Sequence, residues 1–355
     1  MTVTGAIEPD QLGFTLSHAH LVIDLSMYAE PSSDPLEAAF FDGKVTMESL
    51  HYLRYNPYAV KENCVIRNTE EDIEFLTREL KRYAQVGGRS LVDMTLDGFG
   101  RDVVAAKRIS EQSGVQVISG CGNYVKASHP DYVAKLTIDQ LAQKYIDEIN
   151  NGIDGTGIRP GVIGEIGTSK SIFDDEIKVL RAAAIAQAET GLPINIHIPC
   201  SVWENVFWIM DILKEAGADL EHVVLSHRCG CLVFPSLAFN EAVDHLASIA
   251  DRGCYVELDL VGCIYPYFTP TEVLWHHADD RERAYALYEL CQRGYGEKLL
   301  LSHDAAYRFY YSSYGGWAPT HISTVFRKML EEVGLLNSDF ENFMINNPKR
   351  AFTIF

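Results

Sequence analysis

Residues 161–227 contain three short apolar runs: GVIGEI at 161–166, PINIHI at 193–198 and HVVLSH at 222–227. Each run carries an acid or a histidine near its carboxyl end, namely Glu165, His197 and His227. Glu165 and His197 are 32 positions apart, and His197 and His227 are 30 apart. One β/α unit of a barrel of about 250 residues occupies roughly 31 residues. Runs that are apolar throughout are typical of parallel strands buried on both faces. The stretch therefore predicts successive units of a (β/α)8 barrel.

The same alternation extends over the rest of the chain. Five further apolar runs, at 14–18, 90–95, 115–120, 254–259 and 298–304, complete a set of eight predicted strands. Segments with the length and mixed faces of helices occur between or after them, at 69–86, 174–190, 202–216, 239–252, 281–293 and 321–333. Several of these end at glycine, the usual helix stop. A final helix is expected at 338–352, with a break at Asn346-Asn347-Pro348. An open doubly wound sheet is the alternative, but no GxGxxG or P-loop motif follows any run.

We therefore expect residues 1–355 to form one domain, a distorted (β/α)8 TIM barrel of the α/β class. Three longer segments, 26–68, 262–280 and 308–317, are predicted to be loops at the carboxyl-terminal face of the strands, where barrel enzymes carry their sites. The second of these loops contains Tyr265, Tyr267, Phe268 and Trp275, which are candidates for a pocket wall or for the core of the loop itself.

Composition narrows the classes of partner. The formal net charge of −19 favours solubility and argues against nucleic acid or an anionic membrane as a partner; a solvated acidic surface is the preferred interpretation. A small-molecule substrate is expected. No apolar stretch is long enough to span a bilayer. The eight cysteines form no CxxC pair, and the first 13 residues lack the pattern of a secretory signal. Reduced thiols and a cytoplasmic location are expected.

The candidate chemistry lies at the predicted strand ends. His18 and His20 share one face of the first strand, because residues i and i+2 of a strand point the same way. Buried acids are unfavourable unless they are paired or bound to metal. Six residues of metal-ligand type occupy such ends: His18, His20, Glu165, His197, His227 and Asp304. Six ligands exceed one catalytic zinc site with three protein ligands. We expect two divalent metals sharing a carboxylate, with Zn²⁺ as first choice and Mn²⁺, Co²⁺, Fe²⁺ or Ni²⁺ as alternatives.

These motifs resemble the phosphotriesterase family of the amidohydrolase superfamily, nearly from end to end. The matching stretches are GFTLSHAH at 13–20 with Asp24, GVIGEIGTS at 161–169, Ile196-His197, LSH at 225–227, LSHD at 301–304 and Asn347-Pro348. The resemblance implies that His18, His20 and Asp304 bind the more buried metal and that His197 and His227 bind the more exposed one. It also implies that Glu165 bridges both metals beside a hydroxide, which attacks the substrate while Asp304 orients it and accepts its proton.

The chain departs from the family pattern at three positions. The phosphotriesterase itself bridges its metals with a carboxylated lysine, whereas Glu165 stands here, as in the phosphotriesterase-related branch. Lys170 lies in the following loop and is not expected to be the bridge. Leu260 follows Asp259 where the family enzyme has a histidine, so that proton shuttle is absent or replaced. Ala19 replaces a common glutamate, which we interpret as a packing change.

Three residues are weaker candidates for substrate contacts. Tyr124 lies just beyond the third strand, where lactonases of this family place a tyrosine; loop packing is the alternative. Arg228 could bind an anionic group or form an ion pair between loops. Asp259 could contact the substrate or close the end of its strand by a hydrogen bond. His303, next to Asp304, is expected to be structural.

The predicted reaction is hydrolysis by the metal-bound hydroxide. A carboxylic ester or lactone is the first choice of substrate, because the glutamate bridge at Glu165 and the presence of Tyr124 argue against a dedicated triesterase. An N-acyl amide is the second choice, and phosphotriesters would be a slow side activity. A non-catalytic metal-containing binding protein is the alternative of another class, but a structural site does not need a base such as Asp304. Homodimer formation is an open possibility for barrels of this type.

Overall fold

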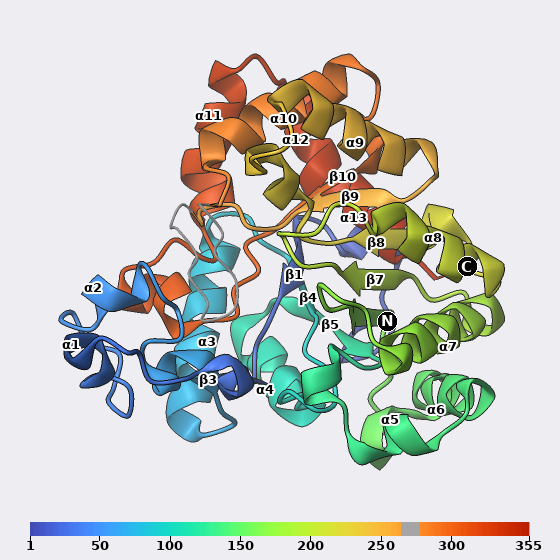
Figure 1. Ribbon diagram of the computed structural model, residues 1–355, viewed down its shortest axis with the longest axis horizontal. Coiled ribbons are helices and arrows are strands. Elements are labelled where there is room, and N and C mark those ends of the chain that lie inside the picture. The colour runs from blue at the N-terminus through green and yellow to red at the C-terminus, as the bar shows by residue number, and fades with distance from the viewer. Residues whose placement is uncertain (264–276, 355) are drawn as a thin grey trace.

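The computed structural model describes residues 1–263 and 277–354, and its described strands form a nearly closed parallel barrel (Figure 1). Neighbouring strands follow the order of the chain, as repeated β/α units require. The predicted (β/α)8 fold is confirmed. The eight barrel strands are β1 (Thr15–Ala19), β4 (Ser90–Asp93), β5 (Gln116–Cys121), β6 (Val162–Gly167), β7 (Ile194–His197), β8 (Val223–Leu225), β9 (Tyr255–Leu258) and β10 (Leu299–Leu301).

The first and last strands meet and close the circle. Ser17 Oγ donates a hydrogen bond to the Leu301 carbonyl at 3.2 Å, and the His18 amide donates to Ser302 Oγ at 3.1 Å. The Ser302 hydroxyl in turn donates to the His18 carbonyl. A parallel bridge joins Ala19 to Ala305 just beyond these contacts. Residues at the two ends of the chain therefore arrive at the same mouth of the barrel.

Helices surround the barrel on its outer side (Figure 1). The longer ones are α3 (Glu70–Gln85), α4 (Val103–Ser113), α6 (Ile138–Asn151), α7 (Asp174–Thr190), α8 (Val206–Glu215), α9 (Phe239–Asp251) and α10 (Asp280–Gln292). The sequence pattern did not single out α4, α6 or the short α5 (Asp131–Lys135), which occupy the intervals after β4 and β5. The helix expected at 202–216 begins only at Val206, because residues 204 and 205 form a turn ahead of it.

The C-terminal helix follows the predicted break. It consists of α12 (Asn337–Glu341), a π-helical turn over Asn342–Asn346, and α13 (Asn347–Phe352). Pro348 has no N–H to donate, so it is tolerated in the first turn of α13 but could not stand inside a regular helix. The helix expected at 321–333 has the same construction, with a π-helical turn over Ile322–Phe326 before α11 (Arg327–Glu332).

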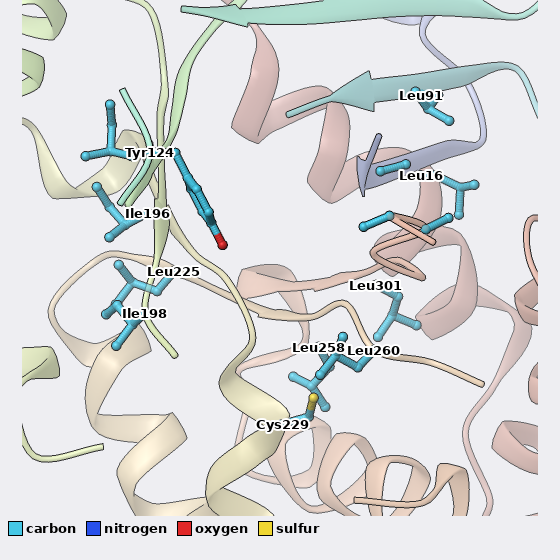
Figure 2. Packing of buried hydrophobic residues seen from close by; sticks show 14 of the residues in the cluster. Leu16, Leu91, Tyr124, Ile196, Ile198, Leu225, Cys229, Leu258, Leu260 and Leu301 are labelled. Carbon is cyan, nitrogen blue, oxygen red and sulfur yellow. The ribbon is translucent and has the colours of Figure 1, made fainter. Parts of the chain in front are cut away.

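Alternation along the strands divides the core into two layers. Along each strand, one side chain faces the barrel axis and the next faces the helices, because side chains alternate along a strand. The inner cluster contains Val92, Met94, Ile118, Val162, Val224, Tyr255 and Leu300, and Leu12 and Phe352 pack against it. The outer cluster contains neighbours such as Leu16, Leu91, Leu225, Leu258 and Leu301 (Figure 2).

The long segments lie around the mouth. Between β1 and α3 the chain forms β2 (Ile23–Asp24), which pairs antiparallel with β3 (Val65–Ile66), and a protruding lobe with α1 (Pro35–Ala38) and α2 (Leu50–Leu53) (Figure 1). Arg308, after β10, anchors this region by donating to the carbonyls of Glu62 and Val65, and it forms an ion pair with Asp72 of α3 at 2.6 Å. Tyr265, Tyr267, Phe268 and Trp275 lie outside the described residues. None of the helices within 1–263 and 277–354 has the length and apolarity needed to cross a membrane.

Asn347 provides a test of how the C-terminal helix is fixed to the barrel. Its fully buried side chain donates to the carbonyls of Gly296 at 2.8 Å and Leu299 at 2.7 Å. Asn347→Ala removes this donor from the buried Leu299 carbonyl and from the half-buried Gly296 carbonyl, so we expect the free energy of unfolding to fall by about 2–4 kcal/mol. The exposed Asn337 is the control, and Asn337→Ala should change it by less than about 0.5 kcal/mol. Equal urea midpoints for the two variants would contradict this role.

Candidate metal centre

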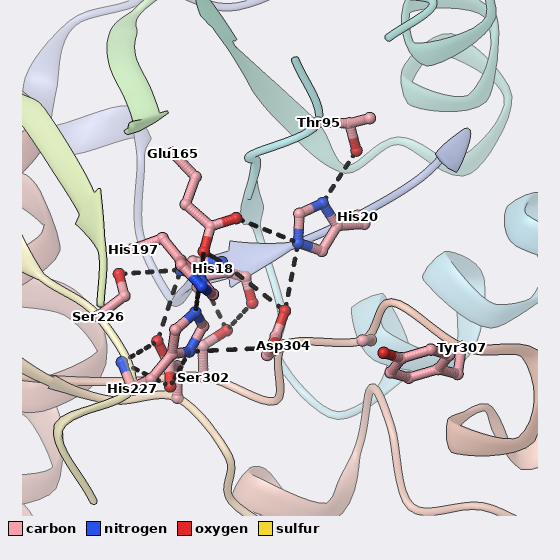
Figure 3. Close-up of polar contacts among 12 residues, drawn as sticks. His18, His20, Thr95, Glu165, His197, Ser226, His227, Ser302, Asp304 and Tyr307 are labelled. Atoms are coloured by element: carbon pink, nitrogen blue, oxygen red, sulfur yellow. Dashed lines mark hydrogen bonds and ion pairs between the residues drawn. The ribbon is translucent and has the colours of Figure 1, made fainter. Parts of the chain in front are cut away.

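The site residues lie at the carboxyl ends of the barrel strands, or directly after them, where the loops begin. His18 lies in β1, Glu165 in β6 and His197 at the end of β7. His227 and Asp304 follow β8 and β10 and have positive φ values of 61° and 45°. This left-handed conformation is unfavourable for residues other than glycine and is typical of functional sites. It turns the chain sharply, so that both side chains reach the barrel axis (Figure 3).

Glu165 is the centre of the cluster. Its Oε1 lies 2.8 Å from His197 Nδ1, 2.8 Å from His227 Nε2 and 3.5 Å from His18 Nε2. Its Oε2 lies 3.9 Å from His20 Nε2. One carboxylate therefore faces all four imidazoles, as a bridging group must (Figure 3). The side chain is only 2 % exposed, which makes an unpaired charge there unfavourable.

Asp304 joins the cluster from the opposite end of the chain. Its Oδ1 lies 3.2 Å from His20 Nε2 and 3.7 Å from His18 Nε2. Its Oδ2 lies 4.0 Å from His227 Nδ1. The side chain is 20 % exposed, so Asp304 is the more accessible of the two acids. Asp304 can therefore contact both the other residues of the cluster and a molecule in the adjacent cavity, which it lines.

The charges of these groups depend on one another. Burial alone would raise the pKa of Glu165, but the imidazoles of His18 and His197 overcome this effect and hold the pKa well below its usual value. Burial opposes the charge on Asp304 as well, yet His20, His18 and His227 lower its pKa to about 2. Burial lowers the pKa of His18, whereas Glu165 and Glu257 raise it well above normal. Both acids are thus ionised. Positive charge in the site comes from protonated imidazoles, and a bound metal would displace those protons.

A second layer orients three of the histidine rings. His20 Nδ1 lies 3.0 Å from Thr95 Oγ1, and His227 Nδ1 lies 3.0 Å from Asp259 Oδ1. His18 Nδ1 lies 3.1 Å from Glu257 Oε2. Such contacts from the far ring nitrogen fix the tautomer and leave the other nitrogen for a metal.

The residues fit a pair of divalent metals. His18 Nε2 is fully buried, faces the centre and makes no hydrogen bond within the described residues. An orphaned polar atom of this kind needs a partner. His18, His20 and Asp304 could hold one ion, and His18, Glu165 and His227 form a second overlapping group. Imidazole and carboxylate donors without thiolate suit zinc and its first-row neighbours.

A cavity of about 570 Å³ opens directly above these residues. His20, Glu165, His197, His227 and Asp304 form part of its lining. Ligand pockets of about 300–1,000 Å³ hold small organic molecules and bury most of their surface. His18 is fully buried and is not among the residues that line the cavity.

The structure separates the three weaker candidates. Tyr124 lines the cavity, and its hydroxyl lies 3.3 Å from His197 Nδ1. Arg228 does not line it; its buried guanidinium donates to the carbonyls of Ser226, Val202 and Ile198. Asp259 is fully buried and accepts from the amide of His227, so it orients His227, and it is not among the residues that line the cavity. His303 has the expected structural place, 2.8 Å from the Val261 carbonyl.

Sequence reasoning overlooked Glu257. This residue faces inward like Tyr255, two positions earlier on β9, and is completely buried. Its Oε2 accepts from Ser226 Oγ at 2.7 Å and Asn195 Nδ2 at 3.2 Å, besides His18. The signal in CYVELD was an acid in an apolar run, but Glu257 lies inside the run, whereas Glu165 was identified near the carboxyl end of its run.

Comparison with known proteins agrees with this geometry. The profile of the Phosphotriesterase family matches residues 1–352. The chain belongs to the phosphotriesterase family. The N-acetyltaurine hydrolase of Xenopus tropicalis is 35% identical over 361 residues, covering 99% of this chain and 97% of that protein.

Two solved structures are similar to nearly the whole chain. A resiniferatoxin-binding protein from Rhodobacter sphaeroides has a TM-score of 0.92 and 35% identity, covering 99% of this chain and 94% of its own. A phosphotriesterase homology protein from Escherichia coli, complexed with phosphate in its active site, has a TM-score of 0.76 and 26% identity, covering 97% and 100%. The family assignment and the fold thus rest on nearly complete alignments, and the chain is a hydrolase of this family.

Glu257 gives a test of the second layer that does not depend on activity. Glu257→Gln removes the negative charge that faces His18 Nδ1 but keeps the shape of the side chain. We expect metal affinity to fall about 10–100-fold, measured by competition with a chelator. Glu148→Gln is the control, because Glu148 is a similarly buried acid that pairs with Arg101 outside the site. Wild-type metal affinity in Glu257→Gln would show that Glu257 only fills space.

Proposed function

We propose that this member of the phosphotriesterase family hydrolyses the amide bond of an N-acyl compound at a centre of two divalent metals, preferably zinc. His18, His20 and Asp304 would hold the buried metal, His197 and His227 the exposed one, and Glu165 both. When bound, the metals supply a hydroxide nucleophile near neutral pH and polarise the scissile carbonyl. The observation that carries the proposal is the shared Glu165 carboxylate, with Oε1 2.8 Å from two different imidazoles.

Asp304 is suited to manage the proton of the attacking water. It is the more exposed acid of the cluster, and it lines the cavity. Its low pKa keeps it ionised, so it can accept a hydrogen bond from the water and orient it for attack. The proton can then pass through Asp304 to the departing amine, while the C–N bond breaks and the carboxylic acid is released.

Tyr124 is suited to bind the substrate as a hydrogen-bond donor. Burial raises the pKa of its hydroxyl well above the usual value, and nearby Tyr28 and Glu165 raise it further. The hydroxyl therefore keeps its proton over the physiological pH range. Its place beside His197 lets it donate to the substrate oxygen as negative charge develops there.

We choose an amide because of the activity named for the relatives. This places the N-acyl amide, the second choice from the sequence, ahead of the ester or lactone. N-acetyltaurine hydrolases from Xenopus tropicalis and Mus musculus are 35% and 36% identical to this chain over 99% of its length. A carboxylic ester or lactone becomes the second candidate. Tyr124 supports this candidate, because its hydroxyl lies 3.3 Å from His197 Nδ1 and its position resembles that of a tyrosine in lactonases of this family.

A panel of substrates tests the bond type. Metal-reconstituted enzyme should be assayed with N-acyl aminosulfonates, N-acyl amino acids, lactones, aryl esters and phosphotriesters. We expect the highest kcat/KM for an N-acyl compound, and Asp304→Asn should lower kcat on it by about 10²–10⁴-fold.

Three outcomes would contradict the proposal. Highest kcat/KM on lactones would favour the second candidate. Unchanged turnover in Asp304→Asn would remove the assigned role of this residue. Tight binding without turnover of any panel member by metal-loaded protein would indicate a binding protein.

A further inference from the structure

We propose that the cavity selects amphiphilic N-acyl compounds, with a bulky apolar acyl group on one side and a polar amine portion on the other. This inference rests on the amide hydrolysis proposed above. It concerns the two walls of the cavity, which differ in chemistry and stand on opposite groups of loops. The metal centre lies at the base between them, where the carbonyl carbon must be placed.

The apolar wall comes from the loops after β1, β4, β5 and β10. Its aromatic members are Tyr28, Tyr58, Phe99, Tyr124, Tyr307 and Tyr310. Their rings are in contact: Tyr28 with Tyr58 at 5.9 Å, Tyr58 with Tyr307 at 6.0 Å and Tyr307 with Tyr310 at 5.2 Å between centroids. Aromatic rings arranged in this way offer a large, rigid apolar surface.

A hydrogen bond between two tyrosine hydroxyls further reduces the polarity of this wall. The Tyr307 hydroxyl donates to the Tyr58 hydroxyl at 3.2 Å, so these polar tips are directed at each other. Ile23, Leu25 and Met27 fill the same side of the cavity. A ligand there would meet mainly carbon, apart from the exposed Glu30 carboxylate of the loop after β1. Figure 3 shows Tyr307 beyond Asp304, on the side of the metal centre away from His197 and Ser226.

The polar wall comes from the loops after β6 and β7. Its polar members are Thr168, Ser169, Lys170, Ser171 and Ser201, and the same loops also contribute Phe173, Pro199 and Cys200 to the lining. Lys170 is exposed, and it is the single lysine or arginine among the described residues of the lining. A hydroxyl-rich loop with one cation suits an amine that carries an acidic group, such as an aminosulfonate or an amino acid.

The size of the cavity favours a large acyl group over acetyl. A volume of about 570 Å³ lies in the range that holds drug-sized ligands, and an acetyl group would leave most of the apolar wall wet. Each methylene buried against the wall should therefore strengthen binding. In the reaction, water adds to the carbonyl carbon and the C–N bond breaks. The apolar acid stays on the aromatic side, and the amine takes the proton and leaves past the polar loop.

A chain-length series measures this preference. The substrates are N-acetyl, N-hexanoyl and N-decanoyl derivatives of one aminosulfonate, assayed with metal-reconstituted enzyme. Full burial would raise kcat/KM about fourfold per methylene. We expect at least about a tenfold increase from acetyl to hexanoyl. A flat or falling series would overturn the inference and leave the proposed amide hydrolysis intact.

Met27 allows the wall to be altered without touching the metal centre. Met27 is half-buried and lines the apolar side. Met27→Asp should lower the hexanoyl-to-acetyl ratio of kcat/KM about fivefold or more, because it brings a charge to the acyl surface. Met27→Leu should keep the ratio within about twofold. Ser171→Ala on the polar wall is the matched control and should leave the ratio unchanged. Equal loss in all three variants would contradict an apolar acyl site.

Calorimetric binding of acetate, hexanoate and decanoate separates this inference from the proposed function. Tighter binding of the longer acids, lost in Met27→Asp, supports the apolar wall even if no amide is hydrolysed, and in that case the proposed function alone falls. Binding that does not depend on chain length would overturn the inference whatever the enzyme hydrolyses.

Discussion

The constraint on which the site depends is the burial of one carboxylate among four imidazoles. Glu165 is 2 % exposed, and its charge needs compensation that water cannot provide. The imidazoles give part of it, and His18 Nε2 is turned inward without a hydrogen bond among the described residues. A bound cation would satisfy both groups together. The positive φ of His227 and Asp304 belongs to the same arrangement, because the fold maintains these unfavourable conformations only where surrounding contacts enforce them.

The barrel brings these groups together through strand alternation and closure. Inward-facing positions carry apolar residues in the lower part of the barrel and polar residues towards its mouth, as along β9 from Tyr255 through Glu257 to Asp259. Closure between β1 and β10 places His18 beside Asp304, although 286 positions separate them in the chain. The same strands thus build the core, the ligands and the second layer that orients them.

Much of this arrangement could be predicted from the sequence, for identifiable reasons. The β/α spacing from Glu165 to His227 predicted the barrel, because parallel strands recur once per unit. The six cluster residues were found because acids and histidines are unusual at the ends of apolar runs. The exact roles of Arg228 and Asp259 were not accessible, since they depend on whether a side chain faces the cavity or a neighbouring strand end. Glu257 was overlooked because it lies inside a run and not at its end. Helices α4 and α6 were overlooked although their boundaries carry capping signals: Asp102 and Gly114 flank α4, and Thr137 forms a capping box with Gln140 at the start of α6.

Anomalous diffraction from crystals grown with a single divalent metal, recorded at the absorption edge of that metal, tests the central claim most directly. The account predicts two peaks on either side of the Glu165 carboxylate. One should lie among His18, His20 and Asp304, and the other beside His197 and His227. A single peak, or two peaks that do not share Glu165, would contradict the binuclear centre on which the proposed hydrolysis depends.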